Sequence, residues 1–238
     1  MNELAVPTLW TPETYNSFIT KLETLKDDKY LEFSKKLTIT KYRMIGIRVP
    51  VLRFLTKEIK KTNYEEFLKL IKHNTFEEIF IEGIIISYIK DYSQFLTHFK
   101  NYLNYIDNWA ICDMVLSSMK IIGKNKQKFE KVIKKLLRSK NEFYVRVGIV
   151  SLLNYYIEKE NLQKIFAYLD NINHSGYYVH MAIAWIVSIL YIKYPKETEK
   201  YLKNNNLDSK TLNRAIQKIR ESTRVSKKEK DYLLKYKK

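Results

Sequence analysis

A tryptophan and an aspartate lie four residues apart in the segment 108–122, whose hydrophobic periodicity predicts a helix. Residues at this spacing share one helical face, so we expect the side chains of Trp109 and Asp113 to project side by side. Cys112 and Leu116 make the rest of that stripe apolar. A carboxylate on an apolar stripe is costly unless it is paired or used. It suits electrostatic stabilisation of a cationic group; the alternative is a structural carboxylate that caps a neighbouring helix or pairs with an arginine.

Arg146 is a second candidate, because the other positions of the segment 141–153, within the predicted helix 141–159, are mainly apolar. A guanidinium there suits a bidentate clamp on a phosphate, or it neutralises Asp113. The alternative is an arginine that extends along the surface with its charge in water. The sequence alone leaves these roles open.

Trp185 is a third candidate, within the predicted helix 176–193. One face of this helix carries Tyr178, Met181, Ala182, Trp185 and Ser188. Spacing of this kind favours a core position. The small alanines beside Trp185 also suit a ring left open to a ligand.

Other catalytic chemistry finds no support in the sequence. The four histidines form no metal-binding motif, and the single cysteine excludes an internal disulfide. No glycine-rich phosphate loop or nucleophile-elbow serine occurs. We therefore expect no metal or organic cofactor, and any catalysis should rest on carboxylate, arginine and aromatic side chains.

The charge balance points to a polyanionic partner. Lysine and arginine total 43 against 26 acidic residues, which gives a net charge of +17. Such an excess favours nucleic acid over a membrane surface or an acidic protein, although a lysine-rich proteome would produce it too. The basic residues form three belts: Lys29, Lys35, Lys36, Lys41, Arg43, Arg48 and Arg53; Lys120, Lys124, Lys126, Lys128, Lys131, Lys134, Lys135, Arg138 and Lys140; and Lys218, Arg220, Arg224, Lys227, Lys228 and Lys230.

The fold class is predicted to be all-α. Helical periodicity recurs along the chain, and only five glycines and four prolines interrupt it. The predicted helices form pairs of about 35–45 residues, the period of HEAT-like repeats. We expect one α-solenoid domain over 1–238 with a curved, basic groove, flexible over its first ten or so and last few residues; a helical bundle is the alternative.

The most apolar run, 79–89, contains Glu82, so we expect no membrane span and a cytoplasmic monomer.

Five motifs carry a resemblance to a known family. They occur in this order: Gly46-Ile-Arg-Val-Pro-Val-Leu-Arg53, Trp109 with Cys112-Asp113, Arg146 in its apolar helix, Met181-Ala-Ile-Ala-Trp185, and Ala215-Ile-Gln-Lys-Ile-Arg-Glu-Ser222 followed by Arg224-Val225. With this set the chain resembles the bacterial DNA alkylation repair family, the AlkD-type DNA glycosylases, from about Lys26 to Leu234.

The resemblance implies a C-shaped solenoid that binds duplex DNA and excises N3- and N7-alkylated purines without a cofactor. It assigns the catalytic carboxylate to Asp113, the groove tryptophans to Trp109 and Trp185, and the groove arginine to Arg146. An N-terminal aromatic residue of the groove falls on Tyr30 or Phe33. The helix of Trp185 is less cationic than in many relatives.

Two other functions remain as alternatives. One is a noncatalytic HEAT-like protein that binds nucleic acid and releases no base. The other is a HEAT-type scaffold for protein partners, for which the charge is incidental. The combination of a carboxylate with aromatic residues argues against both.

Overall fold

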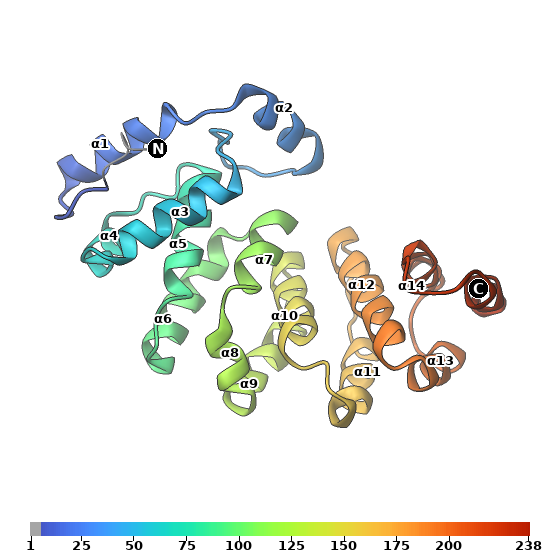
Figure 1. The fold of residues 1–238 in the computed structure, drawn as a ribbon. Coiled ribbons are helices and arrows are strands. Elements are labelled where there is room, and N and C mark those ends of the chain that lie inside the picture. The colour runs from blue at the N-terminus through green and yellow to red at the C-terminus, as the bar shows by residue number, and fades with distance from the viewer. Residues whose placement is uncertain (1–5) are drawn as a thin grey trace. The chain divides into compact units, whose positions relative to one another are not determined.

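The computed structural model describes residues 6–238, and in this range it is helical, with one isolated bridge between Arg43 and Thr75 and no strand (Figure 1). The all-α prediction is therefore confirmed for the described residues. No helix among them is both long and apolar enough to cross a membrane. The chain divides into two units, 1–121 and 122–238.

The first unit is built around α5. Its α-helices are α1 (Pro12–Glu23), α2 (Asp28–Leu37), α3 (Val49–Lys60), α4 (Tyr64–Leu70), α5 (Phe76–Ile86), α6 (Tyr92–Tyr102) and α7 (Trp109–Leu116), with a 3-10 turn η1 (Leu103–Tyr105). α5 packs against α3, α6 and α7, and α4 packs against α1 and α3. Every residue of α5 is buried, as expected for a helix that is apolar on all sides.

Three buried glutamates interrupt the apolar surface of α5, and each has polar partners. Glu78 accepts hydrogen bonds from the Thr75 amide (2.8 Å) and the Tyr15 hydroxyl. Glu82, which argued against a membrane span, lies 2.8 Å from the His73 ring nitrogen. Glu77 accepts from main-chain amides of the loop before α3. Buried carboxylates are tolerated when they are satisfied in this way.

The second unit contains a row of long helices. Its elements are α9 (Lys126–Leu136), α10 (Glu142–Tyr155), η2 (Lys159–Asn161), α11 (Leu162–Asp170), α12 (Tyr177–Lys193), α13 (Pro195–Lys203), α14 (Ser209–Glu221), α15 (Lys227–Tyr232) and η3 (Leu233–Tyr236), while the short α8 (Lys120–Lys124) crosses the boundary between the units. α12 packs between α10 and α14, while α9 packs on α10 and α13 on α12 (Figure 1). The alternate helices α10, α12 and α14 of this unit therefore pack side by side in a row.

Glu130 joins α9 to α11. Its carboxylate accepts hydrogen bonds from the Tyr168 hydroxyl (2.5 Å) and the Lys164 ammonium (3.2 Å). Burial acts to raise the pKa of Glu130, but these hydrogen bonds outweigh it and hold the pKa below its ordinary value. The native contacts therefore favour the ionised carboxylate.

The prediction of a single helix over 108–122 is wrong, because α7 ends at Leu116 and α8 begins at Lys120. The Ser117 hydroxyl donates to the Met114 carbonyl (2.8 Å), and the Arg53 guanidinium donates to the same oxygen (3.2 Å). Side chains that bond main-chain groups in this way compete with helix continuation.

Both ends of the described chain make specific contacts. Trp10 is buried, and its indole N–H donates to the Thr62 hydroxyl (2.8 Å). At the other end, the main chain of Lys238 exchanges two hydrogen bonds with the Asn213 side chain.

Candidate functional site

The start of α7 is fixed by two residues that precede it. The buried Asn108 side chain accepts from the Ile111 amide (2.9 Å) and so caps the helix. Asp107 accepts from the Thr40 hydroxyl (2.8 Å) and the Lys41 amide (2.7 Å). The loop after α2 is thereby attached to the N-terminus of α7.

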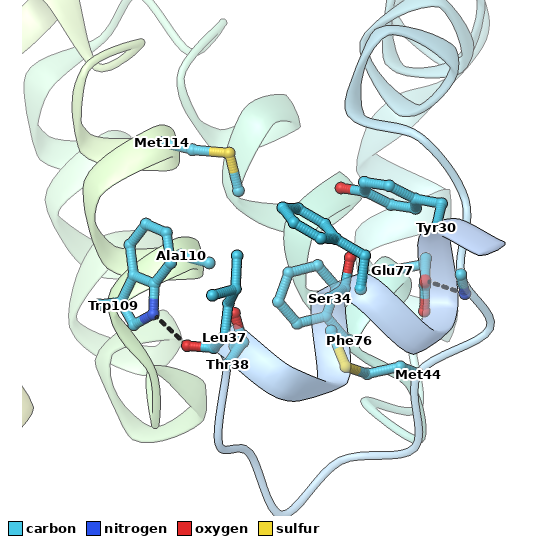
Figure 2. Close-up of a pocket in the computed structure, with 12 residues that line it drawn as sticks. Tyr30, Ser34, Leu37, Thr38, Met44, Phe76, Glu77, Trp109, Ala110 and Met114 are labelled. Carbon is cyan, nitrogen blue, oxygen red and sulfur yellow. Dashed lines mark hydrogen bonds between the residues drawn. The ribbon is translucent and has the colours of Figure 1, made fainter.

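Trp109 is the first residue of α7, and its indole is held in place by α2. The indole N–H donates to the Leu37 carbonyl, at 2.9 Å, where α2 ends (Figure 2). The side chain is half-buried. One edge of the ring is therefore anchored by the protein while part of the ring stays accessible.

A hollow of about 120 Å³ lies beside Trp109 (Figure 2). Its lining is mostly apolar and consists of Tyr30, Phe33, Ser34, Leu37, Thr38, Met44, Gly46, Phe76, Glu77, Trp109, Ala110 and Met114. Both aromatic residues between which the sequence could not choose are present here. Tyr30 and Phe33 line the same hollow from one face of α2.

Glu77 holds the loop that borders this hollow. Its carboxylate oxygens accept from the amides of Ile45 (2.9 Å), Gly46 (2.8 Å) and Ile47 (3.2 Å). Gly46 has φ +98°, and an added methyl group would lie 2.6 Å from the Leu31 side chain, so α2 sits directly on this glycine. The sequence analysis missed Glu77; an acidic residue within an isoleucine- and phenylalanine-rich segment was its only signal.

Asp113 lies one turn after Trp109 on α7, and its side chain is half-buried. Cys112 and Leu116, which complete the predicted stripe, are fully buried. The stripe therefore runs along the border between core and surface, with the tryptophan and the carboxylate on its open side.

Arg53, which the sequence analysis placed in the first basic belt and at the end of the first motif, is a further cation at α7. Its guanidinium donates to the Ser118 hydroxyl (3.0 Å) and the Met114 carbonyl (3.2 Å). A cation at a helix C-terminus is stabilised by the helix dipole. Arg53 thus ties α3 to the end of the helix that carries Asp113.

Arg146 lies in the second unit, on α10, and only 6% of its surface is exposed. The guanidinium donates to the Tyr178 carbonyl (2.9 Å) and lies 6.0 Å from the centre of the Tyr178 ring. The interpretation of Arg146 as an extended surface arginine is therefore wrong. Glu142, on the same helix, accepts from the Tyr178 amide, so α10 and the start of α12 are joined by two polar contacts.

Trp185 is half-buried on α12, which packs against the helix of Arg146. Ala182 and Ser188 of the predicted face are buried, and the Ser188 hydroxyl donates to the Trp185 carbonyl (2.7 Å). The small residues of this face therefore belong to the core, and the tryptophan lies at its edge. His180 is held by the Thr211 hydroxyl and by Asp208, which lies 3.5 Å away.

The basic belts are partly neutralised by local ion pairs. Acidic residues face members of all three belts, in the pairs Arg43–Glu23, Arg48–Asp27, Lys126–Glu158, Lys134–Glu130 and Lys218–Glu221. Apart from the pair that involves Glu130, these are largely exposed ion pairs, which contribute little to stability. Within residues 6–238, no three histidine, cysteine or acidic side chains gather as a metal site requires.

A comparison with models of protein families finds a match over most of the chain. A family model described as "DNA alkylation repair enzyme" matches residues 18–219, which include Trp109, Asp113, Arg146 and Trp185. No curated protein sequence matches the chain.

Proposed function

Because the chain belongs to the DNA alkylation repair enzyme family, we propose that it is a DNA glycosylase that excises N3- and N7-alkylated purines from duplex DNA. Membership of the family makes DNA its substrate. The glycosylase reaction and the alkylated purine as its target are the proposal.

The arrangement of Trp109 and Asp113 is the observation that carries the proposal. The indole is anchored by its hydrogen bond to the Leu37 carbonyl, so its position does not depend on a ligand. The carboxylate follows one turn later, on the open side of the same helix. Because Trp109 is in place before a ligand binds, this part of the site needs little reorganisation during a reaction, and such preorganisation is a main source of electrostatic catalysis.

The proposed chemistry matches these residue types. A purine alkylated at N3 or N7 carries a positive charge and leaves without prior protonation. When the N-glycosidic bond breaks, its electron pair moves to the base, and positive charge develops on the deoxyribose. The Asp113 carboxylate stabilises this charge and orients the water that adds to the sugar carbon and then loses a proton. The Trp109 ring face attracts the cationic lesion, an interaction worth about 0.5–2 kcal/mol.

We propose separate DNA contacts for the second unit. Arg146 holds a phosphate with its guanidinium fork, and the half-buried Trp185 packs against the nucleic acid. The lysines of the basic belts contact further phosphates without reading sequence, so binding should weaken as salt rises.

We also propose a HEAT-like repeat organisation. It is supported by the packing inside each unit, where alternate helices contact one another: α3, α5 and α7 in the first, and α10, α12 and α14 in the second. This is the pattern that stacked helix pairs produce.

The substrate class is tested by incubating the purified protein with methylated duplex DNA and, separately, with duplex DNA containing uracil, and measuring released base. We expect release of 3-methyladenine and 7-methylguanine and none of uracil, because the neutral base is a poor leaving group. Salt-sensitive DNA binding without release from either duplex would favour the noncatalytic nucleic-acid-binding protein instead.

A further inference from the structure

Three large apolar side chains are exposed at the end of α2 and in the loop after it. Phe33, Leu37 and Ile39 expose 59%, 51% and 78% of their surface. A single exposed apolar residue is ordinary, but neighbouring ones mark an interaction site. We name this set the α2 edge.

The α2 edge is held in a fixed position. The Leu37 carbonyl accepts from Trp109, and the following residue, Thr38, is buried. Further along the loop, Asp107 holds the Thr40 hydroxyl. Because the edge is already ordered, binding through it costs little conformational entropy.

The surroundings of the α2 edge are cationic. Four exposed lysines lie in the same stretch, at positions Lys29, Lys35, Lys36 and Lys41. Of these, Lys35 lies 3.7 Å from Glu32, which is a long and exposed pair. An apolar centre with a cationic border matches duplex DNA, in which sugars and base edges lie between rows of phosphates.

We propose that the α2 edge is an apolar contact surface for duplex DNA, pressing against sugars and base edges where the base stack is disturbed. The inference rests on the proposed function and deepens it, because the edge is continuous with Trp109 through Leu37. Apolar side chains are the usual wedges of proteins that bind distorted DNA. Opening a base stack that is already disturbed costs less free energy, so the α2 edge should bind damaged or mismatched duplexes more tightly than fully paired ones.

The test compares the edge variant Phe33→Ala/Leu37→Ala/Ile39→Ala with the wild-type protein. Its matched control, Leu9→Ala/Leu234→Ala, truncates apolar side chains that are 65% and 39% exposed elsewhere. Circular dichroism and thermal melting establish that both variants fold. Fluorescence anisotropy over a salt series then measures affinity for a fully paired duplex and for one with a single mismatch.

We expect the edge variant to bind the mismatched duplex at least about tenfold more weakly, with a smaller loss on the paired duplex. The dependence of affinity on salt should not change, because no cation is removed. By contrast, Lys35→Gln/Lys36→Gln should reduce the salt dependence.

The inference is overturned if the folded edge variant binds both duplexes as tightly as the control does. Binding of wild-type protein to phosphatidylserine vesicles that the edge variant loses, with DNA affinity unchanged, would assign the edge to a lipid surface instead. Failure of the wild-type protein to bind any duplex would refute the proposed function as well, so the two failures are distinguishable.

Discussion

Replacing Glu77 with glutamine should destabilise the first unit strongly, although the two side chains have nearly the same shape. In the native structure one carboxylate oxygen accepts from Gly46 and Ile47, and the other accepts from Ile45 at 2.9 Å. Glutamine can supply only one of these oxygens. Its amide nitrogen would then face the Ile45 amide, so that two donors meet in a buried site.

The size of the effect follows from this geometry. Leaving a buried donor unsatisfied costs about 1–3 kcal/mol, and the remaining hydrogen bonds lose the strength that a charged acceptor gives them. Since Glu77 is 1% exposed, water cannot replace the lost partner. We expect Glu77→Gln to lower the free energy of unfolding by about 2–4 kcal/mol, equivalent to a fall in Tm of about 5–15 °C.

Urea and thermal unfolding measure this loss, and hydrogen exchange at residues 45–47 should accelerate in the variant. Glu66→Gln is the matched control, because the Glu66 side chain is 42% exposed and pairs with the exposed Lys69 on the same helix. The control should change stability by less than about 0.5 kcal/mol. Equal stabilities of the two variants would refute the role assigned to Glu77.

Three further predictions concern individual contacts. Gly46→Ala should lower the free energy of unfolding by about 2–3 kcal/mol, because of its positive φ and the 2.6 Å approach to Leu31; a melting temperature equal to wild type would contradict this. Trp109→Phe keeps an aromatic ring but loses the hydrogen bond to Leu37, so urea unfolding should show a loss of about 1 kcal/mol, and no loss would mean that the bond contributes nothing. Glu130→Gln should lower the free energy of unfolding at neutral pH, and this loss should shrink as the pH falls through the depressed pKa of folded Glu130. The reason is that the carboxylate stabilises the fold above its unfolded pKa and ceases to do so once it is protonated. A loss that is independent of pH would contradict the prediction.

Local sequence signals predicted the helices well where their physical cause is local. Thr11 and Pro12 marked the start of α1, and the structure has a capping box at Thr11 with proline in the first turn. The end of α7 was missed. The Met114 carbonyl there accepts from the nearby Ser117 hydroxyl and also from the Arg53 guanidinium, which comes from a helix distant in the sequence. Periodicity within a segment contains no information about such a partner.

The candidate site also combines local features that the sequence predicts with long-range contacts that it does not. Helical spacing placed Trp109 and Asp113 on one helix, but the anchoring of Trp109 by Leu37 joins residues 72 positions apart. Arg146 was recognisable as a cation in an apolar helix, whereas its burial against Tyr178 follows from packing between α10 and α12. Tertiary hydrogen bonds to main-chain groups have no pattern in the sequence.

The central claim is that Asp113 stabilises the positive charge that develops on the deoxyribose as the alkylated base departs, and single-turnover release of 7-methylguanine tests it most directly. The assay compares wild-type protein with Asp113→Asn on the same methylated duplex, with Kd measured in parallel and Asp28→Asn, at an exposed position, as control. We predict that Asp113→Asn lowers the release rate at least about 100-fold while Kd changes by less than about threefold. An unchanged release rate in a folded Asp113→Asn protein would contradict the claim.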